Sequence, residues 1–193
     1  EIRLSLVGSE MCIRDSNIPV ILLKNLVILP NQEIKLELKN VISGKAINES
    51  SSNFKGEILV IAPTDVLEEE PTAQDLPKVG VIARIKNKLD NDGVIEVKLR
   101  GLRRVAVSKY FQEVNSDILY SEVMYIDLPS LVPEEENAIL KKLVSVLKEY
   151  INVSKTVSND ILTFVSSNKD LNKITDAITS FFCLLYTSDA ADD

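Results

Sequence analysis

The sequence contains no histidine and no tryptophan, and it has only two cysteines. The lack of histidine excludes His-based catalytic triads and removes the commonest metal ligand of proteins. Cys12 and Cys183 lie near the two ends of the chain, in segments that we interpret below as non-native, so no disulfide framework and no cysteine metal site are expected between them. We therefore expect no catalytic, cofactor-binding or metal-binding residue in this chain, and by default a cytoplasmic location.

Long hydrophobic runs are also missing. The longest apolar stretch, Ile18–Leu29, is interrupted by Pro19, Lys24 and Asn25, and it falls short of the roughly 20 residues that a membrane-spanning helix needs. The sequence has no internal repeat and no G-x-x-x-x-G-K-[ST] phosphate-binding motif. We expect neither a membrane span nor a nucleotide site.

Both ends of the chain resemble translated sequencing-library adapters. Met11–Ser16, MCIRDS, corresponds codon by codon to ATG TGT ATA AGA GAC AG, the mosaic end of a transposon used to prepare libraries, and the resemblance begins at Leu6. Cys183–Asp193, CLLYTSDAADD, corresponds to the reverse complement of the partner adapter. Natural tails would require two independent coincidences. We expect residues 1–16 and 183–193 to be non-native and to take no part in the fold.

The net charge changes once these ends are set aside. They contain six of the 29 acidic and two of the 22 basic residues, so residues 17–182 hold 23 acids and 20 bases, a net charge of −3 rather than −7. A dedicated nucleic-acid binder normally carries a basic excess. This balance of acidic and basic residues therefore argues against a dedicated nucleic-acid-binding protein.

The centre of the sequence predicts an antiparallel β-meander. Val79–Ile85 alternates apolar and polar residues, as a half-buried strand does. Asp90–Gly93 supplies the side chains and the glycine that a hairpin turn needs, and Val94–Leu99 alternates again. We interpret Arg100-Gly101 as a second reversal that leads into a third strand at Val105–Val107.

The segments before and after the meander predict further strands. A short helix is predicted at Val41–Asn48, ended by the serines of 50–52. The acid run Glu68–Glu70 lies in a polar loop, Pro63–Pro77, and we interpret it as solvated rather than as a metal or partner site. The other predicted strands are Ile18–Leu23 with Leu26–Leu29, Ile34–Leu38, Glu57–Ala62 and Tyr120–Asp127. Within Ile34–Leu38 apolar and charged residues alternate, which predicts that one face of this strand is exposed to solvent.

The apolar period becomes helical after Pro129. Pro133 suits a first helical position, and the acids of 134–136 suit the positive end of the helix dipole. Two more helices are predicted at Asn159–Ser166 and Asp170–Phe182. The sequence thus predicts an α+β protein with a β subdomain over residues 17–128 and a helical subdomain over residues 129–182.

Over essentially all of residues 17–182, the chain resembles the N-terminal, substrate-binding domain of the Lon ATP-dependent protease family. The similarity rests on the order of PVILLKNLVILPNQEIKLEL, GEILVIAPTD, LPKVGVIARI, the Asp92-Gly93 hairpin and RGLRRVAV. Asn31 departs from the glycine that many members carry there, but asparagine also tolerates the left-handed conformation, so we expect the turn to survive.

The resemblance implies a fold and a function. The fold would be a small, twisted antiparallel β pseudobarrel of the PUA-like type, followed by helices. The function would be the recognition of unfolded, damaged or tagged proteins for an ATP-dependent serine endopeptidase, together with support for its homo-oligomeric ring. ATP, Mg²⁺ and a Ser and Lys catalytic pair would belong to further domains. Ser108 and Lys109 do not form that pair, because neighbours on a strand point to opposite faces.

Two other functions stay open. A free-standing Lon-domain adaptor without ATPase or protease would have the same sequence features in this region. An RNA-binding pseudobarrel is suggested by a cluster of basic residues, but the low net charge and the lack of interleaved aromatics favour a solvated face. That cluster comprises Lys98, Arg100, Arg103 and Arg104. The residues that would contact a polypeptide substrate are unknown from the sequence.

Overall fold

The computed structural model describes residues 17–24, 26–63, 76–91, 93–126, 131–153 and 159–189. The chain divides into two compact units, which we describe separately: Glu1–Ile28 with Glu33–Asp127, and Leu29–Gln32 with Leu128–Asp193. Among the described residues, no helix has the length and apolar character that a membrane span requires.

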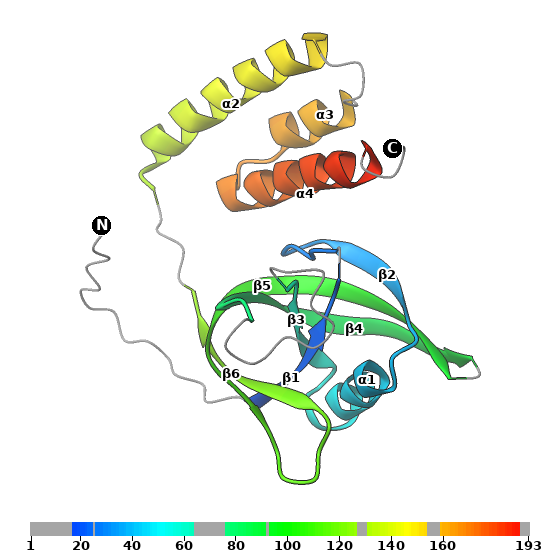
Figure 1. Ribbon diagram of the computed structural model, residues 1–193. Coiled ribbons are helices and arrows are strands. Elements are labelled where there is room, and N and C mark those ends of the chain that lie inside the picture. The colour runs from blue at the N-terminus through cyan, green and yellow to red at the C-terminus, as the bar shows by residue number, and fades with distance from the viewer. Residues whose placement is uncertain are drawn as a thin grey trace. The chain divides into compact units, whose positions relative to one another are not determined.

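The first unit is a ring of strands with one additional strand and one helix (Figure 1). The strand order is β2-β5-β4-β3-β1-β6, and β6 pairs back onto β5, which closes the ring. All pairings are antiparallel except β1 with β3, so the sheet is mixed rather than antiparallel throughout. The predicted α+β class is confirmed. The elements are β1 Asn17–Leu22, β2 Glu33–Leu38, α1 Val41–Asn53, β3 Glu57–Ile61, β4 Val79–Asn91, β5 Val94–Gln112 and β6 Leu119–Tyr125.

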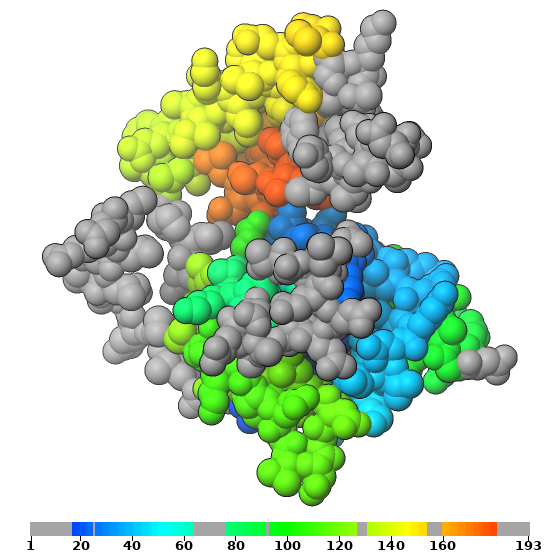
Figure 2. Space-filling view, viewed as in Figure 1, coloured from blue at the N-terminus to red at the C-terminus, as the bar shows by residue number. Residues whose placement is uncertain are grey.

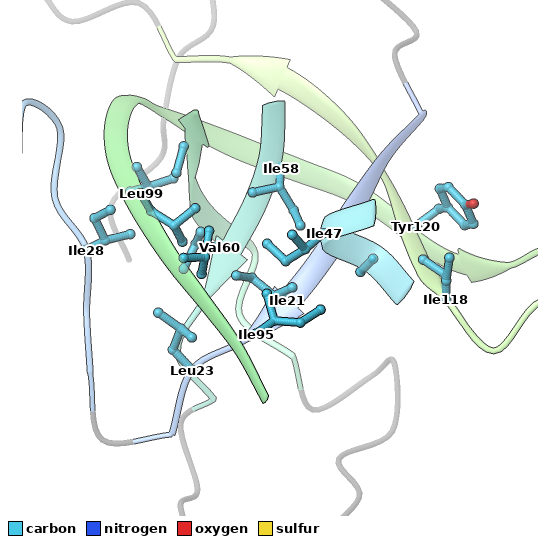
Figure 3. Close-up of a cluster of buried hydrophobic side chains, with 14 residues drawn as sticks. Ile21, Leu23, Ile28, Ile47, Ile58, Val60, Ile95, Leu99, Ile118 and Tyr120 are labelled. Atoms are coloured by element: carbon cyan, nitrogen blue, oxygen red, sulfur yellow. The ribbon is translucent and has the colours of Figure 1, made fainter. Parts of the chain in front are cut away.

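The sheet is buried on both faces. Along β1, Ile21 packs into a cluster that includes Ala46 and Ile47 of α1, whereas Ile18 and Val20 pack into a second cluster. We call these the α1-side cluster and the opposite cluster; Figure 3 shows the α1-side cluster. Because side chains alternate between the faces of a strand, burial on both faces demands a continuous apolar run, as the sequence has here.

The predicted reversal at Arg100-Gly101 is wrong. β5 runs without a break through this point, and the register with β4 shifts there, because Ala83 pairs with Gly101 whereas Ile82 pairs with Arg103. The extra residue, Leu102, forms a β-bulge. A bulge moves every later side chain to the other face of the strand.

This change of face gives β5 two roles. Val97 and Leu99, before the bulge, lie in the α1-side cluster, whereas Val105 and Val107, after it, lie in the opposite cluster. The glycine and the polar neighbours that suggested a turn instead mark a bend within one long strand.

The hairpin between β4 and β5 is confirmed. Asn91 pairs with Val94, and Gly93 has a φ of 86°, the left-handed conformation that the turn requires. The strands extend closer to the turn than predicted, because Asp90 and Asn91 still belong to β4. Val79, predicted to face the core, is instead 53% exposed.

Helix α1 continues beyond its predicted end through the serines. The hydroxyl of Ser50 donates to the carbonyl of Glu57 at 2.8 Å, and that of Ser51 donates to the carbonyl of Ile47, also at 2.8 Å. Because these hydroxyls are satisfied, they do not compete with the helical backbone. The helix ends where Lys55 and Gly56 both adopt positive φ.

The remaining predicted strands are confirmed within two residues at their ends, except that residues 26–29 form no strand. Residues 64–75, with the acid run at 68–70, lie outside the described part of the chain. Leu76, which follows them, is buried.

The second unit contains three helices in the described residues. They are α2 Pro133–Val153, α3 Asn159–Ser167 and α4 Leu171–Asp189. Pro133 is the first residue of α2, as predicted, and Asp170 caps α4 by accepting from the N–H of Asn172 at 3.0 Å. α4 extends past the predicted end at Phe182, so residues 183–189, which we expected to take no part in the fold, continue the helix. The helices share one cluster of fully buried side chains, which consists of Leu147, Ile161, Val165 and Ile174.

The close packing of β3 against β4 generates one prediction. A Cβ added at Gly80 would lie 2.9 Å from Leu59 Cδ1 and 3.2 Å from the carbonyl oxygen of Val60. We expect Gly80→Ala to lower the free energy of unfolding by about 1–3 kcal/mol, as overpacking does. Urea unfolding measures this.

Gly44→Ala serves as the control. Its added Cβ would meet only the flexible side chain of Ile95, whose terminal methyl is nearest at 3.0 Å, and alanine favours a helix interior by about 1 kcal/mol over glycine. It should cost at least about 1 kcal/mol less than Gly80→Ala. Equal effects would contradict the proposed overpacking at Gly80.

A second prediction concerns the chain ends, which we propose to be adapter-derived. The described side chains of α4 that pack into its unit, Ile174 and Ile178, precede residue 183. Deleting residues 1–16 and 183–193 should therefore leave the Tm within about two degrees, since surface changes away from packed features are nearly neutral. A large loss of Tm, measured by calorimetry, would show that one end is native structure.

Candidate functional site

Strand β2 forms an edge of the sheet. It pairs with β5 on one side, from Glu33 opposite Arg100 to Leu38 opposite Ile95. On its other side, no strand of the described residues pairs with it, and we call this side the free edge. Every second residue of an edge strand directs its N–H and C=O outward, so this edge offers backbone donors and acceptors to another extended chain.

The two faces of β2 differ in chemistry. Ile34, Leu36 and Leu38 pack against the α1-side cluster and remain partly exposed at the edge. The exposed residues Glu33 and Lys35 lie on the other face, as the alternation in the sequence predicts. A strand added alongside β2 would continue both an apolar and a polar face.

Diagonal ion pairs hold β2 to β5. In register, Lys35 lies opposite Lys98 and Glu37 opposite Glu96, which places like charges together. Lys35 Nζ instead reaches Glu96 at 2.6 Å, and Lys98 Nζ reaches Glu33 at 2.6 Å. The hydrogen bond from Lys98 lowers the pKa of Glu33, and the hydrogen bond to Glu96 raises the pKa of Lys35.

Both ends of β2 are fixed by local structure. Before it, Asn31 adopts a φ of 65°, so the turn survives the replacement of glycine, as expected. After it, the side chain of Asn40 accepts from the N–H of Ile42 at 2.8 Å and caps α1. Val41 and Ile42 are 72% and 46% exposed, which adds apolar surface directly beside the strand.

The basic residues named from the sequence do not form one patch. Lys98 is paired with Glu33, and the guanidinium of Arg103 lies 4.7 Å from the centroid of the Tyr125 ring. Arg104 pairs in register with Val81, on the α1 side, whereas Lys98, Arg100 and Arg103 lie on the other face. The bulge at Leu102 thus separates Arg104 from the other three residues.

No catalytic pair is assembled from Ser108 and Lys109. The Ser108 hydroxyl donates to the carbonyl of Glu122 at 3.0 Å, and the Lys109 ammonium lies 5.9 Å from the centroid of the Phe111 ring. Each side chain therefore has a structural contact of its own. In the part of the chain that the structure describes, no group of three or more acidic, histidine or cysteine residues could hold a metal ion.

The free edge is the feature that sequence reasoning missed. Alternation predicted that β2 has one wet face, but an edge is defined by which strands pair, and β2 pairs with residues about 60 positions later. The only local signal is the row of charged side chains on the exposed face of β2, because charged side chains are common on edge strands.

Comparison with known proteins places this architecture in a family. The sequence pattern of the ATP-dependent protease La (LON) substrate-binding domain matches residues 17–188. The chain is 30% identical over 164 residues to the Lon protease of Buchnera aphidicola subsp. Schizaphis graminum and 26% identical over 164 residues to that of Escherichia coli K12. Each alignment covers 84% of this chain, but only 21% and 20% of the relatives.

Solved structures share the fold. The N-terminal domain of the Mycobacterium avium complex Lon protease has a TM-score of 0.61 at 20% identity, over 84% of this chain and 81% of that domain. A Lon N-terminal domain protein from Xanthomonas campestris has a TM-score of 0.51 at 19% identity, over 86% and 98%. The chain therefore belongs to the family of ATP-dependent protease La (LON) substrate-binding domains.

Proposed function

We propose that this chain binds unfolded or damaged polypeptides, as the substrate-recognising domain of an ATP-dependent serine protease. The observation that carries the proposal is the free edge of β2 in a member of this family. Backbone hydrogen bonds to an edge strand depend little on the sequence of the added strand. That property suits a domain that must accept many different unfolded chains.

The edge would also select for unfolded polypeptide. The added strand must place apolar side chains beside Ile34 and Leu36. Its own backbone groups must also be unpaired before it binds. Folded proteins keep such segments paired and buried, whereas unfolded proteins expose them. Recognition would then combine backbone hydrogen bonds with burial of partly exposed apolar surface.

Two observations favour a polypeptide over RNA as the ligand. Residues 17–182 carry a net charge of −3. Of the four candidate basic residues, Lys98 and Arg103 are engaged with Glu33 and Tyr125, and Arg104 lies on the other face of the sheet. RNA binding normally requires a continuous basic surface with stacking aromatics. We also propose a cytoplasmic location, because residues 17–182 contain no cysteine and so nothing in them requires an oxidising compartment.

Binding to unfolded protein is the direct test. A fluorescently labelled, reduced and carboxymethylated protein should bind with an affinity that changes less than about threefold between about 50 and 200 mM salt, because few charges are neutralised. Hydrogen exchange of residues 33–38 should slow on binding, while that of β3, inside the ring, should not change. Affinity for RNA alone, falling about a thousandfold over this range, would overturn the proposal.

Proline substitutions provide a matched pair of variants. Adjacent residues of a strand direct their N–H groups to opposite sides, so one of Lys35 and Leu36 donates to β5 and the other faces the free edge. Proline at the edge-facing residue should abolish binding while keeping every backbone bond to β5, whereas proline at the other residue should break one of those bonds and lower the Tm. Unchanged binding in the folded edge-facing variant would exclude β2 as the binding edge.

The rest of the protein remains a proposal, because the chain spans about a fifth of the length of the relatives it matches. We propose that the gene encodes, beyond residue 182, a P-loop ATPase that binds ATP and Mg²⁺, and a serine protease domain with a Ser and Lys pair. The parent would assemble as a homo-oligomeric ring.

Genomic sequence tests this prediction. Reading the gene past the codon for Phe182 should reveal a G-x-x-x-x-G-K-[ST] motif, since ATP-dependent unfolding requires a phosphate-cradling loop. A stop codon soon after this point, without such a motif, would instead favour the free-standing adaptor.

A further inference from the structure

Glu37 is the charged residue of β2 that forms no ion pair with β5. Three charged side chains, Glu33, Lys35 and Glu37, are exposed on the polar face of this strand. Lys98 of β5 reaches Glu33, and Lys35 reaches Glu96 of β5. Among the described residues Glu37 has no such partner, and Glu96, which lies opposite it in register, carries the same charge.

The cross-strand row that contains Glu37 has an excess of negative charge. Glu37 lies opposite Glu96, and Glu96 lies opposite Leu89 of β4, so the three side chains point to the same face. The row contains no cation, and Lys35 enters it only to bind Glu96 at 2.6 Å. Lys39, beyond the end of β2, forms no ion pair with Glu37. Two carboxylates therefore share one ammonium group at this end of the strand.

A strand added at the free edge would place one of its side chains beside Glu37. Figure 2 shows the segment of β2 and α1, in lighter blue, at the surface beside the β4–β5 hairpin in green. Side chains directly opposite one another in an antiparallel pair have Cβ atoms about 4.5–5.5 Å apart. A lysine or arginine at that distance would pair with Glu37, whereas an acidic residue would add a third carboxylate to the row. Glu33 and Lys35 exert less preference, because residues of β5 already compensate their charges.

We propose that Glu37 makes the free edge of β2 selective for segments in which apolar residues alternate with lysine or arginine. The apolar residues of such a segment would continue the row of Ile34, Leu36 and Leu38, and a basic residue would lie beside Glu37. This inference rests on the proposed binding of unfolded polypeptide at β2. A single surface ion pair contributes little energy, so the selectivity is a preference among many accepted segments.

Competition between two peptides tests this preference. Both are about ten residues long with blocked ends, and they alternate valine with either lysine or glutamate. Every register that keeps valine on the apolar face then places the same charge beside Glu37. The lysine peptide should displace a labelled, carboxymethylated protein at about a fifth of the concentration that the glutamate peptide needs.

Two variants separate Glu37 from the net charge of the protein. Glu37→Gln should at least halve the ratio between the two peptides. Glu113→Gln removes the same charge just beyond the other end of β5, so it should leave the ratio unchanged. Both variants should keep the Tm of the wild type, since both side chains are exposed.

The outcomes distinguish this inference from the proposed function. Equal competition by the two peptides, or an unchanged ratio in Glu37→Gln, would overturn the role of Glu37 and leave the proposed function intact. An equal fall of the ratio in both variants would assign the preference to net charge and would overturn that role as well. Failure of the labelled protein to bind at all would overturn both proposals.

Discussion

Burial of the sheet on both of its faces is the constraint on which the β unit depends. Five strands close into a ring, and side chains from the same strands fill two separate clusters. β5 satisfies this constraint only because the bulge at Leu102 exchanges its faces midway along the strand. Without that extra residue, Val105 and Val107 would leave the cluster in which they are buried. One inserted residue therefore lets a single strand complete both halves of the core.

The closed ring also explains why β2 is an edge strand. Each strand of the ring has partners on both sides, whereas β2 is attached outside the ring to the first half of β5 and has no second strand partner among the described residues. Its exposed row is charged, and diagonal ion pairs hold it to β5. Such pairs at the surface contribute little energy. The apolar residues of β2 specify the register, because a shift by one residue would turn them away from the core.

A binding edge built from backbone atoms, as we propose for β2, would have a consequence for the family. Backbone donors and acceptors do not depend on side-chain identity, so relatives that share only 26–30% of their residues with this chain can retain the same edge if they retain the strand. Such an edge would leave no side-chain motif in the sequence.

The sequence by itself determined most of the elements and the composition of the core. Period-two and helical patterns predicted the strands and helices, the Asp92-Gly93 hairpin and the start of α2 at Pro133, because these depend on neighbours a few residues apart. Tertiary structure alone decided that Arg100-Gly101 is a bend within a strand, that α1 continues through its serines, and that β2 is an edge. Each of these depends on partners distant in the sequence: the register with β4, the carbonyl of Glu57 beyond the end of α1, and the closure of the ring by β6. Local pattern carries no information about such pairings, since the same residues would satisfy a turn equally well.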